Sequence, residues 1–307
     1  MALSPVGRSP AFKAALQLAG RVAPESSPVV LCGATGTGKS LFARYMHEQG
    51  SHPSEPFLEW HAASVPETLL ESEILGIEPG AATDVTGKPG LFEATGEGTL
   101  CLTGLESLSP HQQAVLLRIL ENHEVERLGG RRKVKVRVRI LASFQTTPEI
   151  LCAQGRLRRD LLYRLDVFRL ELPPLNQRTQ DIPLLAAHFM SELARRRRKK
   201  APKLAPALQE AFERHLWRGN IRELAQVLER LYLLGKDVVG PPDLPPSFWK
   251  EDATIAGALE RGLTLSELKE AYIYEVLGRV GGSRTEAAKW LGISRKALWE
   301  YLKRSSS

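Results

Sequence analysis

The chain is 307 residues long, with 43% hydrophobic and 25% charged residues and a formal net charge of +7 at pH 7. This composition is typical of a soluble globular protein, and the length favours about two to three domains. No apolar run approaches the ~18 residues that a membrane span needs, and residues 1–8 lack the pattern of a secretion signal. We therefore expect a cytoplasmic protein with no membrane partner, whose positive charge favours a polyanion.

The three cysteines are Cys32, Cys101 and Cys152, and they stand far apart in apolar or helical surroundings. Their spacing does not fit a metal-ligand pattern. We expect buried thiols in a reducing compartment, with neither a disulfide nor a zinc site.

The most specific pattern is a glycine-rich stretch between an apolar run and a helix-forming run. It fits the G-x-x-x-x-G-K-[ST] pattern of a phosphate-binding loop, in the strand, loop and helix context that the motif requires. Glycines let backbone N–H groups turn onto phosphate oxygens, the lysine reaches the outer phosphates, and the serine hydroxyl is a ligand for Mg²⁺. A chance glycine-rich turn is the alternative interpretation. The residues expected to hold a nucleotide are Gly33, Ala34, Thr35, Gly36, Thr37, Gly38, Lys39 and Ser40, and Ser40 is also expected to hold the metal.

Residues 1–172 alternate short apolar strands with helical stretches, which predicts an α/β fold with a parallel sheet covered by helices. A glycine-rich stretch at 76–90 is expected to project as a loop. The expected strands are 29–32, 57–60, 99–102 and 136–142, and the expected helices are 66–75 and 109–122.

The pattern becomes wholly helical over residues 173–238, which predicts a small helical domain. A basic run at 195–200 between two of its helices indicates a solvated loop rather than a dedicated nucleic-acid patch. The expected helices are 182–194, 205–215 and 220–234, with Asn220 as the N-cap of the last.

A proline-rich stretch follows and cannot propagate a helix, so residues 239–262 are expected to form a linker. Residues 263–307 then indicate three short helices, in which Ser283 and Ser294 are expected caps. Ala288, Gly292, Leu298 and Tyr301 fall where a helix-turn-helix needs a small residue, a sharp turn and two apolar anchors. The predicted partner is duplex DNA, contacted by Arg284, Ser294, Arg295, Lys296, Trp299, Glu300 and Lys303.

Several stretches carry a resemblance to the bacterial enhancer-binding proteins, the AAA+ activators of sigma-54 RNA polymerase. They are residues 66–73, 172–175, 180–183 and 219–224, in family order, followed by a tail that resembles a Fis-type helix-turn-helix. The resemblance implies a P-loop AAA+ core with a helical lid, ATP and Mg²⁺ as cofactors, and self-association as a ring or dimer. The chain looks like a minimal member in which no receiver or ligand-sensing domain precedes the core.

The resemblance also assigns roles to three arginines. Arg158 and Arg164 match two arginine fingers, which act on a neighbouring subunit by stabilising charge on the transferring phosphoryl group. Arg222 matches the nucleotide-sensing arginine of the lid. Surface arginines without a role are the alternative for any one of them alone, but three in matching order favour the family assignment.

The chain departs from the family at the strand that normally ends in Asp-Glu, because Thr103 and Gly104 stand there. The aspartate normally helps to hold Mg²⁺ and the glutamate polarises the attacking water, and neither replacement can accept that proton at neutral pH. Glu106 is a possible substitute carboxylate, although we expect it beyond the strand end. Asparagines that the family places nearby are replaced by His61 and Gln145.

The projecting loop departs as well. The family contacts the sigma factor with Gly-Ala-Phe-Thr-Gly-Ala, whereas residues 80–85 of this chain place Ala82 in the position of the phenylalanine and add Asp84. Loss of a buried aromatic anchor can cost on the order of 2 kcal/mol at an interface. Another loop residue could substitute for it.

These observations predict an ATP-binding, sequence-specific DNA-binding transcription regulator that is a poor or inactive ATPase and contacts sigma-54 weakly. It would work with sigma-54 RNA polymerase or join rings of an active relative. The first alternative is a fully active, ATP-hydrolysing sigma-54 activator. A metabolic P-loop kinase is the second, and the helix-turn-helix tail argues against it.

Overall fold

The computed structural model describes residues 5–80, 87–250, 264–280 and 283–304. The chain divides into two compact units, Met1–Leu184 with Gly219–Arg222, and Leu185–Arg218 with Glu223–Ser307. Within the described ranges, no helix is long and apolar enough to cross a bilayer.

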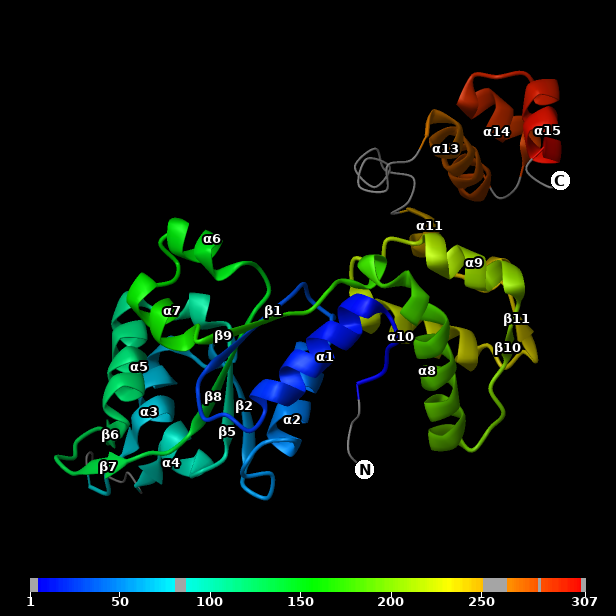
Figure 1. The fold of residues 1–307 in the computed structure, drawn as a ribbon. Helices are drawn as coiled ribbons and strands as arrows, with labels where there is room; N and C mark the ends of the chain where they lie inside the picture. Colours follow the sequence, from blue (N-terminus) through cyan, green and yellow to red (C-terminus); the bar gives the residue numbers. More distant parts are fainter. Residues whose placement is uncertain (1–4, 81–86, 251–263, 281–282, 305–307) are drawn as a thin grey trace. The chain divides into compact units, whose positions relative to one another are not determined.

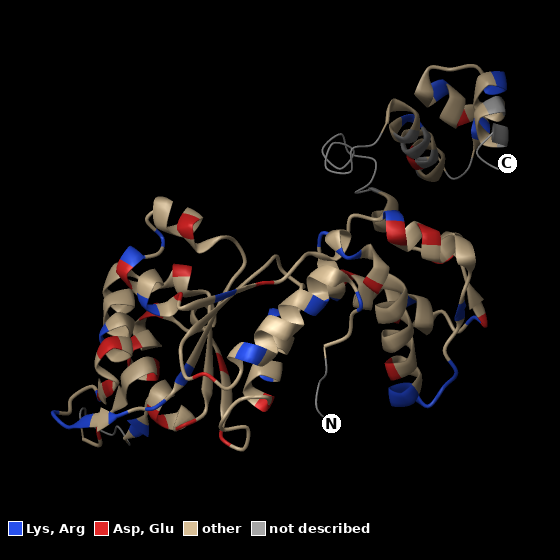
Figure 2. Cartoon of the chain, viewed as in Figure 1, with Lys and Arg blue, Asp and Glu red and all other residues tan. Residues whose placement is uncertain are grey.

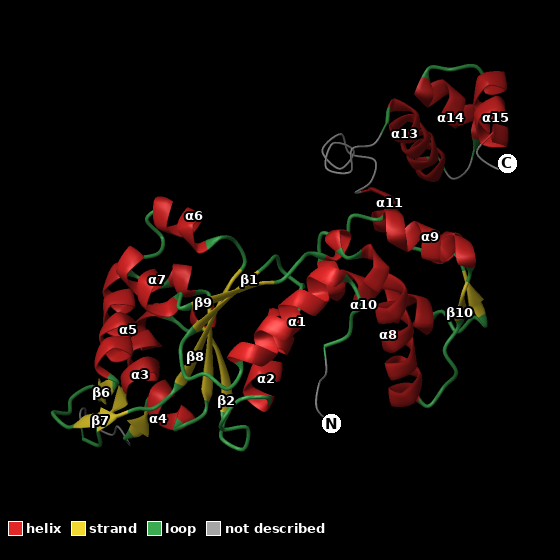
Figure 3. Ribbon diagram, viewed as in Figure 1, coloured by secondary structure: helices red, strands yellow, loops and turns green. Residues whose placement is uncertain are grey.

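The first unit is built on a five-stranded, wholly parallel sheet in the order β2-β5-β8-β1-β9 (Figure 3). The interior strand β1 is buried along its whole length, as expected of a strand covered on both faces. The strand β9 was missing from the sequence prediction, and β8 begins three residues later than predicted. The strands are β1 (Val29–Cys32), β2 (Phe57–His61), β5 (Thr99–Thr103), β8 (Arg139–Phe144) and β9 (Phe168–Glu171).

Helices cover both faces of this sheet (Figure 1). On one face α1 (Pro10–Val22) and α2 (Lys39–Glu48) pack against the strands, and α1 was not predicted. Its boundary follows from Ser9, whose side chain caps the helix, with proline in the first turn. The other face is covered by α3 (Leu70–Leu75), α4 (Leu91–Thr95), α5 (Pro110–Asn122) and α7 (Arg159–Leu165), and α6 (Pro148–Ala153) lies nearby in the chain.

Two short hairpins meet at one end of this unit. In the first, β3 (Gly76–Ile77) pairs antiparallel with β4 (Lys88–Pro89), at the base of the predicted projecting loop. In the second, β6 (Glu124–Glu126) pairs with β7 (Lys133–Lys135), and the backbone of Leu128 bonds to Gly76 and Glu78. The predicted sigma-contact residues from 81 to 85 lie outside the described residues.

The second unit begins with the rest of α8 (Ile182–Arg197) and contains α9 (Pro206–Arg214), most of α10 (Asn220–Leu233) and a parallel pair of short strands, β10 (Lys203–Leu204) and β11 (Val238–Val239). The predicted loop at 195–200 is helical as far as Arg197. Arg196 pairs with Glu192 one turn earlier, and Arg197 pairs with Glu229 on α10, so both arginines are held on the helix.

Part of the predicted linker is also folded. Residues 241–243 form a 3₁₀ turn and Pro246–Lys250 form α11. Phe248 is buried, because its ring stacks on His215 at a centroid distance of 4.0 Å and meets the edge of Trp217. An apolar side chain with such a partner orders the segment despite its prolines.

The C-terminal helices are α13 (Leu265–Arg279), α14 (Arg284–Leu291) and α15 (Arg295–Arg304). Ser283 and Ser294 cap α14 and α15 as predicted, and Gly292 ends α14 in the left-handed conformation, with φ +65°. Leu298 and Ala288 lie in the small core, whereas Tyr301, which was predicted as the second apolar anchor, is 36% exposed. Its ring instead lies beneath the ammonium of Lys269, at 4.5 Å.

Candidate functional site

The phosphate-binding loop follows β1 and leads into α2, which begins at Lys39. Its three glycines Gly33, Gly36 and Gly38 have φ of +156°, +79° and +105°, so each takes a backbone conformation that L side chains rarely adopt. The first-turn N–H groups of α2 have no acceptor within the helix. The loop thus presents unpaired donors and the positive end of a helix dipole, which is the arrangement that phosphate groups require.

Lys39 and Ser40, the polar residues at the start of α2, both donate hydrogen bonds to oxygen atoms of the protein. The ammonium of Lys39 donates to the carbonyl oxygens of Gly33 at 2.6 Å and Ala34 at 3.0 Å. Burial lowers the pKa of Lys39, because the charged form loses hydration, and the positive charge of Arg222 lowers it further. The hydroxyl of Ser40 donates to Oε1 of Glu59, on the edge strand β2, at 2.5 Å. The sequence analysis did not single out Glu59.

The first turn of α10 closes over the loop within the same unit. The N–H of Ile221 donates to the carbonyl oxygen of Gly36 at 3.0 Å, and the side-chain amide of Asn220 donates to that of Thr35 at 2.8 Å. A Cβ at Gly36 would lie 2.1 Å from the carbonyl oxygen of Gly219 and 3.2 Å from the Cβ of Arg222. Only glycine therefore fits at position 36, and Arg222 is brought to the loop.

Further contacts fix the middle of the loop. Thr37 is buried, and its hydroxyl donates to the carbonyl oxygen of Ala34 at 2.9 Å. The buried guanidinium of Arg178 donates to the carbonyl oxygen of Thr37 at 2.9 Å. The hydroxyl of Thr35 donates to Oε1 of Gln145, which follows β8, at 3.0 Å. Six of the eight predicted residues, 33–38, thus form one ordered loop, while Lys39 and Ser40 open α2, and the residues present fit the phosphates of a nucleotide.

A histidine, His61, packs beside positions 103 and 104, where the family has its two carboxylates. β5 ends at Thr103, whose hydroxyl donates to the carbonyl oxygen of Trp60 at 3.2 Å and lies 2.8 Å from Nδ1 of His61. Gly104 has φ +70°, and a Cβ there would lie 2.9 Å from Cε1 of His61. His61 therefore occupies the space into which a side chain at position 104 would extend.

The remaining predicted catalytic residues lie apart from the loop. Glu106 sits in a 3₁₀ turn, Leu105–Ser107, and its Oε2 is buried with no hydrogen-bond partner among the described residues. Arg158 forms a two-bond ion pair with Asp160, at 3.0 and 2.6 Å. Arg164 donates twice to the carbonyl oxygen of Leu120, at 3.0 and 2.7 Å, at the end of α5. Both arginines are exposed.

The predicted DNA-contacting residues lie on α14 and α15. Arg284, Arg295 and Lys296 are exposed, and Trp299 is 51% exposed. Ser294 is engaged as the cap of α15 through the N–H of Ala297, at 3.1 Å. Figure 2 shows basic positions on both helices. Glu300 and Lys303 belong to α15, but their side chains lie outside the described part of the structure.

Three stretches of the chain match known protein families. Residues 5–171 match the Sigma-54 interaction domain, residues 176–258 match the AAA+ ATPase lid domain, and residues 264–304 match the bacterial regulatory proteins of the Fis family. The first match alone covers more than half of the chain. The chain belongs to the sigma-54 enhancer-binding protein family.

Two relatives in this family come from Escherichia coli K12. The chain is 37% identical to the regulatory protein AtoC over 300 residues and 37% identical to the transcriptional regulatory protein ZraR over 301 residues. The alignments cover 94% and 97% of this chain but 65% and 68% of the relatives. The chain thus spans about two thirds of the length of these proteins.

Solved structures of NtrX from Brucella abortus share the fold. The complex of NtrX with ADP has a TM-score of 0.77 and 32% identity, over 99% of this chain and 70% of that one. The complex with ATP has the same TM-score at 31% identity. The P-loop AAA+ core with a helical lid and a C-terminal helix-turn-helix, expected from the sequence, is confirmed.

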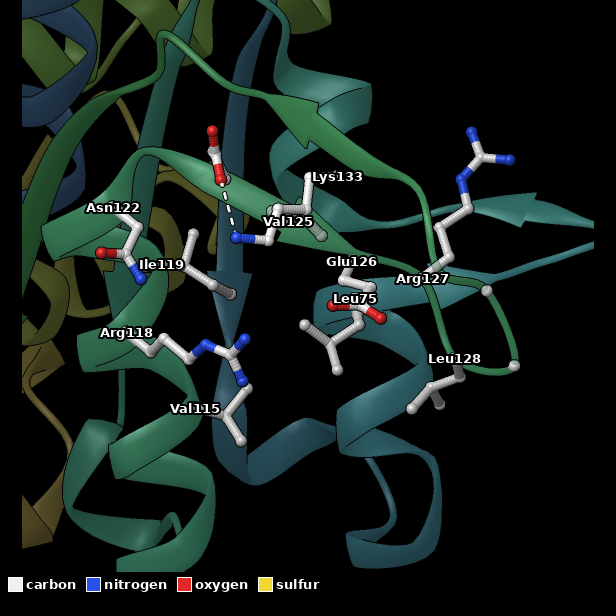
Figure 4. Close-up of a pocket in the computed structure, with 13 residues that line it drawn as sticks. Leu75, Val115, Arg118, Ile119, Asn122, Val125, Glu126, Arg127, Leu128 and Lys133 are labelled. Carbon is white, nitrogen blue, oxygen red and sulfur yellow. Dashed lines mark ion pairs between the residues drawn. The ribbon is translucent and has the colours of Figure 1, made fainter.

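A separate hollow of about 320 Å³ lies between α3, α5 and the second hairpin (Figure 4). Three basic side chains line it, of which Arg127 forms two bonds with Glu93 at 2.8 and 2.7 Å and Lys133 lies 3.4 Å from Glu124, and the third is Arg118. None of the predicted site residues lines it. The hollow is thus distinct from the phosphate-binding loop of this enhancer-binding protein.

Desolvation disfavours ionisation of all three thiols of the chain. Burial raises the pKa of Cys32 to about 11 and that of Cys101 to about 12, because the thiolate loses hydration. Cys152 is half-buried rather than buried as predicted, and desolvation raises its pKa as well. In the described residues no cluster of histidine, cysteine or carboxylate groups fits a metal site of its own.

The closure of α10 over the loop can be tested with Gly36→Ala, using Gly96→Ala as the control. Gly96 has φ +63° and open space around it, so alanine there carries only the left-handed strain of about 1 kcal/mol. Gly36→Ala adds the collision with Gly219, about 2 kcal/mol more, which lowers the thermal midpoint of unfolding by a further ~4 to 8 °C. Equal midpoints for the two variants, measured by calorimetry, would contradict the close approach.

Proposed function

We propose that this chain is an ATP-binding, sequence-specific DNA-binding transcription regulator that binds ATP well and hydrolyses it slowly. The proposal rests on one contrast. The phosphate-binding loop and Arg222 are intact, whereas Thr103 and Gly104 stand where the resemblance expects two carboxylates. Binding and hydrolysis depend on different groups, so the first can persist without the second.

For binding, the loop N–H groups donate hydrogen bonds to the phosphate oxygens, and Lys39 exchanges its bonds with the carbonyl oxygens of Gly33 and Ala34 for bonds to phosphate. Arg222 adds a second positive charge at the loop. Ser40 would hold Mg²⁺, and the ion supplies charge neutralisation for the phosphates. The NtrX complexes with ADP and ATP, which share this fold, support nucleotide binding here.

Hydrolysis requires a group that accepts a proton from water. The Thr103 hydroxyl cannot do so at neutral pH, and Gly104 has no side chain. Glu106 lies in a turn with one oxygen buried, which argues against its acting as a substitute. Arg158 and Arg164 can stabilise phosphoryl charge in a neighbouring copy but cannot activate a water molecule. ATP would then stabilise the fold and self-association as a ligand.

The central test measures ATP binding and ATP turnover on the same purified sample. We expect saturable binding that Lys39→Ala abolishes, because the outer phosphates lose their cation, together with slow turnover. Brisk hydrolysis that is sensitive to Lys39→Ala would refute the proposal and favour a fully active sigma-54 activator.

A gain-of-activity variant sharpens this test. Restoring Thr103→Asp and Gly104→Glu requires His61→Asn as well, because His61 occupies the space beside Gly104. We expect the triple variant to raise turnover by ~10² to 10⁴, the usual contribution of a general base. The double variant that keeps His61 is the control, and it should remain slow.

DNA binding is proposed for the C-terminal helices, on the basis of the match to the Fis family and the exposed basic residues at the start of α15. We propose that a dimer reads a palindromic duplex with α15 in the major groove. Phosphate contacts make such binding salt-dependent.

The expected result is that Arg295→Ala with Lys296→Ala weakens binding about 10-fold or more, from the loss of phosphate or base contacts. The measurement is fluorescence anisotropy at two salt concentrations, on a duplex that the full chain selects from random sequences. Arg137→Ala is the control, since this exposed basic residue lies in the AAA+ core. A chain truncated at Lys250 that still binds the same duplex equally well would disprove the assignment.

Contact with sigma-54 is proposed to be weak, because the sequence has Ala82 and Asp84 where the resemblance expects phenylalanine and glycine. The chain would then act as a repressor, with another sigma factor, or in rings of an active relative. A match to the Sigma-54 interaction domain supports the general partner but not the strength of contact.

In a pull-down with purified sigma-54 and ATP, we expect little capture by the native chain. Ala82→Phe with Asp84→Gly should increase capture, because it returns an aromatic anchor and removes a charge that must be desolvated. Strong nucleotide-dependent capture by the native chain, lost on deletion of residues 80–85, would show that the loop works without the phenylalanine.

A further inference from the structure

Glu59 is a carboxylate that lies beside Ser40, the last residue of the phosphate-binding motif. It lies in β2, between the apolar residues Leu58 and Trp60, and its side chain is exposed. Its Oε1 accepts a hydrogen bond of 2.5 Å from the hydroxyl of Ser40, the residue expected to hold Mg²⁺. The exposed position on an edge strand accommodates the charge, and the contact with Ser40 gives it a partner.

The sheet explains how a residue of the edge strand reaches the loop. Glu59 is opposite Cys101 in the parallel register of β2 and β5, and Cys101 lies in the core cluster that α2 covers. Glu59 therefore faces the side of the sheet on which α2 lies. The negative charge of Glu59 contributes, after burial, to the raised pKa of Cys101, which is consistent with this proximity.

The register also relates Glu59 to the missing aspartate. Thr103, which stands in the position of that aspartate, is opposite His61 on β2. Glu59 is two residues before His61, and so projects from the same face of the sheet. A glutamate has a longer side chain than an aspartate, and its carboxylate reaches Ser40 from the neighbouring strand.

We propose that Glu59, together with Ser40, holds the Mg²⁺ ion of bound ATP in place of the aspartate missing at position 103. This inference rests on the proposed binding of ATP. Carboxylate oxygens and a hydroxyl are the ligands that Mg²⁺ prefers. In this role Glu59 binds the metal ion but does not replace the missing base. Mg²⁺ is therefore held although hydrolysis stays slow.

A purely structural role is the competing explanation, because a carboxylate near the start of α2 also stabilises the helix dipole. The metal role predicts that the effect of Glu59 on ATP affinity changes sign between metal-free and metal-containing buffer, and the structural role does not. Without metal, Glu59 places a negative charge near the phosphates and opposes ATP binding. With metal, the same charge favours binding, because the ion lies between the carboxylate and the phosphates.

The experiment measures the affinity of the full chain for a fluorescent ATP analogue, in excess EDTA and in Mg²⁺. In EDTA, Glu59→Gln should bind at least as tightly as the native chain. In Mg²⁺, it should bind about 10-fold or more weakly than the native chain, the usual cost of losing a group that supports a metal. Glu55→Gln, which removes the same charge just before β2, is the control and should behave as the native chain in both conditions.

A direct count of the ion completes the test. Electron paramagnetic resonance of Mn²⁺ in the presence of ATP should show less bound ion for Glu59→Gln. Ser40→Ala should lose the metal effect too, and adding Glu59→Gln to it should cost little more, since both act on one ion.

Three outcomes separate the proposals. The sign reversal with loss of bound Mn²⁺ supports the metal role of Glu59. Equal Mg²⁺ enhancement in the native chain and Glu59→Gln overturns that role but leaves ATP binding intact, and a lowered melting temperature alone would then indicate the helix role. Failure of the native chain to bind the ATP analogue in either condition overturns both the proposed function and this inference.

Discussion

The nucleotide site depends on one close approach between two backbone segments far apart in the chain. The carbonyl oxygen of Gly219 lies in the space that a Cβ of Gly36 would need, and the hydrogen bonds of Asn220 and Ile221 fix this approach. Because Asn220 also accepts the N–H of Leu175 at 2.7 Å, the segment after β9 is tied to the same point. The loop, the segment after the sheet and the first turn of α10 therefore fold as one unit.

The site separates two physical tasks. Holding phosphate needs fixed donors and positive charge, and in the proposed function these come from backbone geometry, Lys39 and Arg222. Activating water needs a base at one defined position, and the end of β5 has a threonine followed by a glycine. In the proposed function binding persists without fast hydrolysis, because the donors do not depend on the residues at the end of β5.

Part of this architecture could be predicted from local sequence. The run Val29–Cys32 predicted β1, because four consecutive buried apolar residues precede a glycine-rich turn. The caps Ser283 and Ser294 and the turn at Gly292 predicted the last two helices, since each signal acts within a few residues. Such features need no knowledge of distant partners.

Other features depend on which segments become neighbours. The strand β9, Phe168–Glu171, has only four residues, two of them exposed, and all four pair with β1. The contact of Glu59 with Ser40 requires the strand order of the sheet, which a single sequence does not reveal. The turn after residue 240 is ordered by the stacking of Phe248 on His215, a partner more than thirty residues away. Spacing along the chain carries no direct signal for these.

The packing of His61 beside Gly104 has a consequence for how this chain can evolve. A glutamate that arises first at position 104 meets both a left-handed backbone, with φ +70°, and the imidazole at 2.9 Å. To make room, the imidazole of His61 would have to move and give up its contact of 2.8 Å with the Thr103 hydroxyl. A smaller residue at position 61 would remove that cost. The effect of any side chain introduced at position 104 thus depends on which residue stands at position 61, so substitutions at these two positions are coupled through packing.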